Sequence, residues 1–299
     1  MRRYIDYLKA HSEYGLVTSD KQGEWCLGDW CCPNVMHPEK YVLMYSQQFL
    51  IPAQMVNTYF MVKSLNTLAK IAKIIGKDKD IAEYEKEAEY RKNVMNAAYF
   101  SMFDNNCMMN AQGANAFAVD LGLGNEKVYS NMVGFYKQIG CFDTGIFGTD
   151  ILTKVLFENG DGELATDLLV NDGPHGFEHW RRIGATTFHE YWDSTRSRSH
   201  NHQMFGAPVA YFFEYLLGIK QTDGSAGYKT LRIAPQATSR FGRMSGSMMT
   251  PNGKVAVSYR KTKEGTTVFN VTIPEGTDAT FVYEDKEVVL SVGENTLEF

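Results

Sequence analysis

The sequence predicts a mainly α-helical protein followed by a small antiparallel β-sandwich. Up to about residue 219, apolar residues recur at spacings of three and four, which is the periodicity of amphipathic helices. After about residue 220 the chain changes to short runs rich in β-branched residues, separated by turn signals. We therefore expect two domains, a helical domain over 1–219 and a β-sandwich domain over 220–299.

The clearest helical signal lies between residues 65 and 95. Leu65, Leu68, Ile71 and Ile75 form one stripe, and Gly76 is expected to end that helix. A second helix is expected to start with a cap at Asp80, so that the pair forms an αα-hairpin. Further helices are expected in the following ranges: 1–12, 113–122, 126–138, 148–158, 162–171 and 204–217. Successive αα-hairpins can close into a toroid whose loops gather at one end, where a binding site is typical.

The β-rich region begins after a polar connection at 221–227. Turn signals follow at Asn252-Gly253, Glu264-Gly265, Glu275-Gly276 and Gly293. Val255, Val257 and Tyr259 alternate with smaller or polar neighbours, as in a strand with one buried face. Closely spaced strands of this kind predict a small antiparallel sandwich.

Composition and charge exclude several kinds of partner. The net charge is -5 and no stripe of Lys and Arg stands out, so nucleic acid is not an expected partner. No apolar run approaches the roughly 20 residues needed to span a bilayer, so no membrane partner is expected. The first residues carry no apolar stretch typical of a signal peptide.

No cofactor is expected from the motifs. The chain has no P-loop, no dinucleotide fingerprint and no Gly-x-Ser-x-Gly nucleophile segment. The five cysteines lack paired Cys-x-x-Cys spacing, so reduced thiols are favoured over a zinc cluster of Cys26, Cys31, Cys32 and His37. His179 and His189 do not share a helix face, which argues against a metal site there.

Three loop clusters combine aromatic residues with carboxylates or histidines, a pairing that suits sugars. In the first, 24–33, Asp29 is interpreted either as an acceptor for sugar hydroxyls or as a capping residue. Trp30 is either a stacking platform or a buried core residue. The composition alone does not choose between these alternatives.

The second cluster spans 175–193 and contains Glu190, which we interpret as a carboxylate that acts on sugar. Arg181 and Arg182 are candidates for substrate contacts or for surface ion pairs. The third cluster spans 197–206, where His202 either donates to a sugar hydroxyl beside Glu190 or belongs to a polar loop that caps the next helix.

At these clusters the sequence resembles the bacterial α-L-rhamnosidase family. The resemblance runs through nearly the whole chain and rests on four segments, two of them long signatures about ten residues apart: Gly28-Asp29-Trp30, Thr144-Gly145-Ile146-Phe147-Gly148-Thr149, Gly184-Ala185-Thr186-Thr187-Phe188-His189-Glu190-Tyr191-Trp192 and Ser199-His200-Asn201-His202-Gln203-Met204-Phe205-Gly206.

The resemblance implies an (α/α)6 barrel that releases terminal α-L-rhamnose with inversion, from a rhamnose-containing oligosaccharide or glycoside. It implies that Glu190 is the general base, which activates water while a second carboxyl group protonates the leaving oxygen. Asp29, Trp30 and His202 correspond to positions where the family binds substrate, and Trp180 is a weaker candidate.

The sequence departs from the family at the general acid. The family carries it in a Glu-Arg-Leu-Gly-Trp-x-Gly-Asp type segment, and nothing here matches that segment. Glu24 lies directly at the later Gly-Asp-Trp loop and is not expected to replace it. We therefore expect the carboxy-terminal portion of such an enzyme, with the missing half or another chain as a partner, and a cytoplasmic or periplasmic location in a bacterium.

Two alternatives remain open at this point. The chain is either the base-carrying part of a rhamnosidase or a non-catalytic module that binds carbohydrate or mediates an interaction. A glycosidase with another sugar specificity on the same toroid is a further alternative, because a fold does not fix a function.

Overall fold

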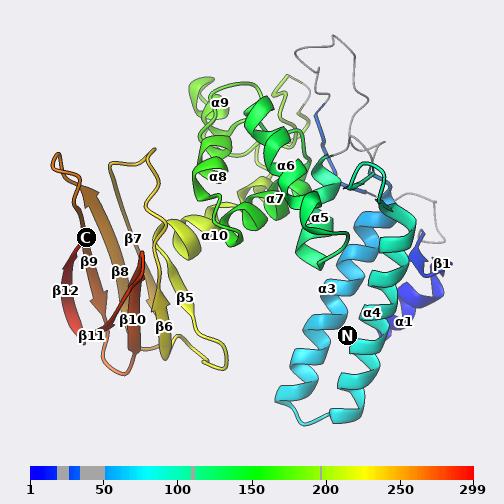
Figure 1. Cartoon of the computed structure of the whole chain (residues 1–299), viewed down its shortest axis with the longest axis horizontal. Helices are drawn as coiled ribbons and strands as arrows, with labels where there is room; N and C mark the ends of the chain where they lie inside the picture. The colour runs from blue at the N-terminus through cyan, green and yellow to red at the C-terminus, as the bar shows by residue number, and fades with distance from the viewer. Residues whose placement is uncertain (19–26, 34–50, 109–111, 196) are drawn as a thin grey trace. The chain divides into compact units, whose positions relative to one another are not determined.

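The structure is a computed structural model that describes residues 1–18, 27–33, 51–108, 112–195 and 197–299 (Figure 1). These residues form two compact units. The first contains residues 1–155 and 170–205, and the second contains residues 156–169 and 206–299. The second unit therefore includes a helical segment as well as the β-rich tail, and the expected domain boundary between residues 219 and 220 stays a prediction.

The first unit is helical. Its helices are α1 (Arg2–Ala10), α3 (Ala53–Ile74), α4 (Asp78–Tyr99), α5 (Gln112–Leu121), α6 (Glu126–Ile139), most of α7 (Ile146–Glu158) and α9 (Phe177–Arg182). Two short antiparallel pairs join them, β1 (Ser12–Glu13) with β2 (Leu16–Val17) and β3 (Phe100–Ser101) with β4 (Asn106–Cys107). The helices expected near 1–12, 113–122, 126–138 and 148–158 are confirmed, whereas α9 was not predicted.

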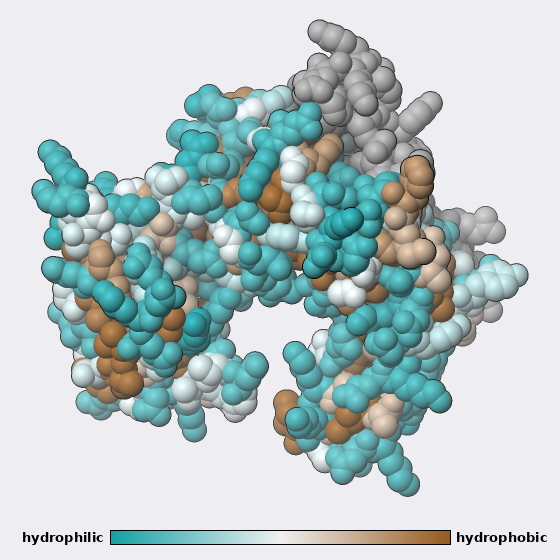
Figure 2. Space-filling model, in the orientation of Figure 1, coloured by the Kyte–Doolittle hydropathy of each residue, from teal (hydrophilic) through white to brown (hydrophobic). Residues whose placement is uncertain are grey.

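Helices α3 and α4 form the predicted αα-hairpin (Figure 1). Gly76 follows α3 with a φ of 67°, a conformation that favours glycine. The cap expected at Asp80 is wrong, because α4 already begins at Asp78 and no side chain caps it. Hydrophilic residues dominate the visible face of the hairpin, with an apolar spot at its loop end (Figure 2), where Ile74 and Ile75 are exposed.

A buried carboxylate ties three helices of this unit together. Asp120 of α5 accepts hydrogen bonds from Tyr59 (2.6 Å) and Lys63 (2.8 Å) of α3 and from Lys154 (2.6 Å) of α7. Burial of the Asp120 carboxylate opposes its ionisation, but the three donors outweigh burial, so the pKa of Asp120 is lowered.

The second unit begins with the end of α7 and with α8 (Gly162–Leu169), which confirms the helix expected over 162–171. The single helix expected over 204–217 is instead divided into three pieces: a 3-10 turn (Gln203–Gly206), α10 (Val209–Tyr211) and a π-helical turn (Phe212–Leu216). Pro208 stands directly before α10, and a proline at this position begins a new helix rather than continuing an old one.

The β-rich tail is a sandwich of two four-stranded sheets, in the orders β11-β10-β6-β5 and β12-β9-β8-β7. The strands are β5 (Ile219–Gln221), β6 (Thr230–Ile233), β7 (Arg243–Thr250), β8 (Gly253–Lys261), β9 (Thr267–Ile273), β10 (Asp278–Tyr283), β11 (Lys286–Leu290) and β12 (Gly293–Glu298). Inward side chains of both sheets form one core, which includes Val257, Phe269 and Phe281. The turns expected at Asn252-Gly253 and Glu264-Gly265 join β7 to β8 and β8 to β9.

The predicted antiparallel sandwich is confirmed, with one parallel pair among its strands. Strand β10 runs parallel to β6, with Ala279 opposite Leu231 and Phe281 opposite Ile233. The chain leaves the first sheet after β6, builds β7 to β9 in the other sheet and returns beside β6 in the same direction. Within the described ranges, no helix combines the length and apolar character required to cross a bilayer.

Candidate active site

The loop that carries Trp30 is fixed by the buried side chain of Asp29. The Asp29 carboxylate accepts hydrogen bonds from the backbone N–H groups of Gly145 and Gly148, both at 2.8 Å. These amides lie at the start of α7, where the first N–H groups lack partners within the helix. Burial raises the pKa of Asp29, and the hydrogen bonds from Gly148, Gly145 and Cys32 only partly offset it.

Gly145 and Gly148 allow this close approach because neither carries a side chain. A Cβ atom at position 145 would collide with the backbone carbonyls of Asp29 and Trp30, and one at position 148 would collide with the Asp29 carboxylate. The backbone N–H of Ile146 also donates to the carbonyl of Trp30 at 2.8 Å. The spacing of glycines in Thr144–Thr149 is therefore explained by the contact between the two loops.

The segment that carries Glu190 pairs with the segment that follows it. The backbone N–H of Glu190 donates to Ser199 at 2.9 Å, and that of His202 donates to Phe188 at 2.7 Å. The N–H of Tyr191 is bound by the Ser197 hydroxyl at 2.9 Å. These bonds hold the two long sequence signatures side by side, without regular strand structure.

Trp192 anchors the same segment in an aromatic cluster. Its side chain is 1% exposed, and its Nε1–H donates to the carbonyl of Thr144 at 2.9 Å. Its ring stacks on Phe142, with centroids 5.7 Å apart, and on Trp180, with centroids 4.9 Å apart. The Thr144–Thr149 segment therefore supports both the Asp29 loop and the Glu190 segment.

Trp30 and Glu190 meet although 160 positions separate them in the sequence. The Trp30 Nε1–H donates to Glu190 Oε1 at 3.4 Å, which is a long contact, and both side chains remain partly accessible. The rings of Trp30 and Tyr191 lie 6.5 Å apart. An indole face, a phenol and a carboxylate thus come together at a partly open position.

The thiol of Cys31 completes this group. It forms a hydrogen bond with the Tyr191 hydroxyl, and burial, followed by the charge of Glu190, raises its pKa to about 12. A thiol with this pKa stays protonated at neutral pH, so it does not act as a nucleophile here. From the sequence, Cys31 was considered only as a possible zinc ligand and Tyr191 was given no role, although each directly follows a residue that was assigned to the sugar site.

The other predicted site residues lie in different surroundings. Asp29 is fully buried with its oxygens bound to backbone amides, so its assignment to substrate binding stays a prediction that its position does not favour. Trp180 is 2% exposed, and no hydrogen-bond partner reaches its Nε1–H. The Nε2 atom of His202 is also buried without a partner. Buried polar atoms of this kind ordinarily have a protein, water or ligand partner.

His189 and the two arginines of the cluster have structural partners. His189 is bound by Ser194 at 2.9 Å and stacks on His200, and burial together with His200 lowers its pKa. Arg181 forms an ion pair with Glu178 on α9. Among the described residues, no group of three or more acidic, His or Cys side chains is arranged to hold a metal ion. Glu24, Cys26 and His37 lie outside the described residues.

Comparisons with known proteins agree over the whole chain. Residues 1–216 match the family described as the bacterial alpha-L-rhamnosidase 6 hairpin glycosidase domain, and residues 218–298 match the bacterial alpha-L-rhamnosidase C-terminal domain. An alpha-L-rhamnosidase of Alteromonas sp. (strain LOR) is 29% identical over 94% of this chain and 31% of its own length. One from Formosa agariphila is 30% identical over 75% of this chain and 26% of its own length.

Solved structures show the same fold. The alpha-L-rhamnosidase from Dictyoglumus thermophilum aligns with a TM-score of 0.82 at 22% identity, over 99% of this chain and 35% of its own. The Streptomyces avermitilis alpha-L-rhamnosidase, complexed with L-rhamnose, aligns with a TM-score of 0.80 at 21% identity, over 99% of this chain and 29% of its own. The predicted class, part of a helical toroid followed by a β-domain, is confirmed, and the chain spans about a third of the length of these relatives.

Proposed function

Because the chain belongs to the bacterial α-L-rhamnosidase family, we propose that it carries the water-activating base of an enzyme that hydrolyses terminal α-L-rhamnosides. Glu190 is that base. Its carboxylate takes a proton from water as the water oxygen attacks the anomeric carbon, and the glycosidic C–O bond breaks on the opposite face. The sugar is therefore released with inverted configuration.

The contact between Trp30 and Glu190 carries this proposal. The indole N–H restrains one carboxylate oxygen at 3.4 Å, while the partly exposed Trp30 ring offers a face to the C–H surface of a sugar. An aromatic face beside an accessible carboxylate matches the two halves of a pyranose, one apolar and one rich in hydroxyls.

His202 and Trp180 are proposed to contact substrate through their unpaired nitrogens. The buried Nε2 of His202 and Nε1–H of Trp180 have no partner among the described residues. A sugar hydroxyl reaching either atom would remove the cost of leaving it unpaired, about 1–3 kcal/mol. Asp29 is proposed to act indirectly, by holding the Trp30 loop against α7.

The general acid is proposed to come from outside these 299 residues, because no segment of the sequence resembles the family's acid motif. The chain should then fail on alkyl rhamnosides, whose leaving oxygen must be protonated. α-L-Rhamnopyranosyl fluoride does not need that proton, because fluoride leaves as a stable anion. The fluoride therefore isolates the step assigned to Glu190.

The test compares hydrolysis of the fluoride by the chain and by its Glu190→Gln variant, using a fluoride electrode. We expect measurable turnover that falls by about 10²–10⁴-fold in the variant. Glu178→Gln, which removes a carboxylate paired with Arg181 in α9, is the matched control and should keep the original rate. Equal rates for the chain and Glu190→Gln would refute the base assignment, and binding of L-rhamnose without any turnover would favour a non-catalytic module.

A further inference from the structure

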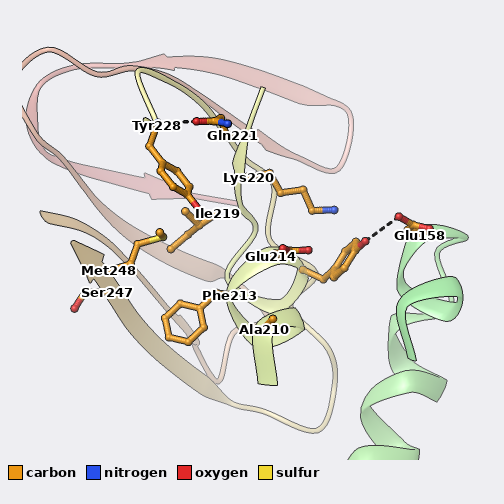
Figure 3. A pocket seen from close by; sticks show the side chains of 11 residues that line it. Glu158, Ala210, Phe213, Glu214, Ile219, Lys220, Gln221, Tyr228, Ser247 and Met248 are labelled. Carbon is orange, nitrogen blue, oxygen red and sulfur yellow. Dashed lines mark hydrogen bonds between the residues drawn. The ribbon is translucent and has the colours of Figure 1, made fainter. Parts of the chain in front are cut away.

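The second compact unit contains a pocket of about 630 Å³ that lies entirely within its own residues (Figure 3). The walls come from the end of α7, from α10 and the π-helical turn, from strands β5 and β7, and from the loop that precedes β6. This volume falls in the range of about 300–1,000 Å³ typical of small-molecule sites.

The lining has an apolar part and a polar part. Phe213, Ile219, Tyr228 and Met248 gather on one side of the close-up, whereas Glu158, Glu214 and Lys220 lie on the other (Figure 3). Two neutral polar groups border the apolar side, Ser247 beside Met248 and Gln221 beside Tyr228. Such a division suits a ligand with one C–H face and several hydroxyls. It does not suit an anion, because two carboxylates face a single lysine.

Lys220 already places a positive charge over an aromatic ring of this pocket. The ammonium of Lys220 lies 3.4 Å from the centroid of the Tyr215 ring, and the Tyr215 hydroxyl donates to Glu158 at 3.2 Å. An external cation would have to displace Lys220. A neutral, hydroxyl-rich ligand needs no such displacement and finds an exposed acceptor in Glu214.

Two backbone irregularities converge on the pocket. Tyr228 has a φ of 60°, a conformation that is uncommon for a bulky residue, and its N–H is held by the Gln221 side chain at 2.7 Å. Phe213, Glu214 and Tyr215 belong to a π-helical turn, a rare form that occurs frequently at functional sites. A backbone conformation such as that of Tyr228 persists only where the surrounding structure enforces it, and such residues cluster at active sites and ligand-binding positions.

We propose that this pocket is a second carbohydrate site, which binds one neutral sugar residue against Tyr228 and Phe213 with Glu214 accepting from its hydroxyls. The proposal rests on the lining of the pocket and not on the role of Glu190. The proposed site binds a glycan and does not cleave it.

The positions of the tryptophans allow the two sites to be observed separately. All four, Trp25, Trp30, Trp180 and Trp192, precede residue 206, and none lines this pocket. Sugar bound beside Trp30 should change the tryptophan fluorescence, whereas sugar bound beside Tyr228 should produce heat in calorimetry without that change.

The experiment titrates methyl α-L-rhamnopyranoside into the full chain by calorimetry, in a Trp30→Ala background that removes the stacking ring of the first site. We expect residual binding, which Tyr228→Gly weakens about tenfold because the stacking ring is lost. Glycine accepts the positive φ, but the Tyr228 ring also packs against the core of the sandwich, so thermal unfolding must show that this variant remains folded at the temperature of the titration. Glu214→Gln should also weaken binding, and Glu264→Gln, in the turn between β8 and β9, is the matched control that should not.

Residual binding that Tyr228→Gly and Glu214→Gln leave unchanged would overturn the proposal. The proposal would also be overturned if Trp30→Ala alone gave no heat with methyl α-L-rhamnopyranoside and none with the methyl glycosides of D-glucose, D-galactose and L-fucose. Loss of fluoride hydrolysis in Glu190→Gln concerns only the first site, so failure of one proposal is distinguishable from failure of the other.

Discussion

The two compact units obtain their order in different ways. In the first, buried carboxylates hold loops and helices together, as Asp29 does at α7 and Asp120 does between three helices. In the sandwich, the inward core is formed by apolar and aromatic side chains such as Val257, Phe269 and Phe281. The comparison indicates that the loop carrying Trp30 depends on a few directed hydrogen bonds, whereas the sheets depend on apolar packing.

Phe281→Ala should have the largest effect on stability. Phe281 is fully buried at the centre of the sandwich, so its loss should destabilise the second unit by about 3–5 kcal/mol. Urea unfolding followed by tryptophan fluorescence, which observes the first unit, should change much less than unfolding followed by circular dichroism. Equal shifts in both signals would contradict the separation of the two units.

Asp29→Ala should destabilise the first unit by about 2–4 kcal/mol, because it leaves the N–H groups of Gly145 and Gly148 buried without acceptors. The same change should reduce hydrolysis of rhamnosyl fluoride, since the Trp30 loop loses its anchor. Asp223→Asn, in the exposed connection after β5, is the control and should alter neither quantity. Reduced hydrolysis with unchanged stability would instead support direct substrate binding by Asp29.

Asp120→Asn should remove a pH-dependent part of the stability. The pKa of Asp120 is lowered in the folded protein, so its contribution is present above the unfolded carboxyl pKa, about 3.9, and disappears as pH falls further. We expect a stability difference between the original chain and the variant at pH 7 that narrows below about pH 4. A difference that stays constant between pH 7 and pH 3 would show that the ion pairs around Asp120 contribute little.

Trp30→Phe should have the smallest effect of these variants, a modest loss of activity on rhamnosyl fluoride. It keeps an aromatic face but removes the N–H that reaches Glu190 across 3.4 Å, a contact whose length indicates a modest contribution. A loss of about fivefold in kcat for rhamnosyl fluoride is expected, corresponding to about 1 kcal/mol, with little change in KM. Trp30→Ala should also raise KM, and equal effects of both variants would argue against a stacking role for the ring.

The difference between local and distant contacts explains which parts of the fold could be predicted from the sequence. The α3–α4 hairpin and the turns of β7, β8 and β9 follow from local periodicity and turn residues, so they were found. The parallel contact between β6 and β10 and the three-part segment 203–216 were not, because each depends on contacts distant in sequence. The six-residue helix α9 is too short for periodicity to reveal.

Dependence on contacts distant in sequence also limited the prediction of the candidate site. The sequence identified Trp30 and Glu190, but not that the indole would reach the carboxylate across 160 positions. It also left two roles open for Asp29, and only the burial of its side chain against Gly145 and Gly148 favours the anchoring role.

The central claim is that Glu190 directs water to the face opposite the leaving group. Proton NMR of the sugar first released from α-L-rhamnopyranosyl fluoride tests it most directly, because the two anomers of L-rhamnose give separate signals before they equilibrate. We expect β-L-rhamnose to appear first, and we expect Glu190→Gln to slow its formation by about 10²–10⁴-fold. Initial release of α-L-rhamnose by the chain would contradict it.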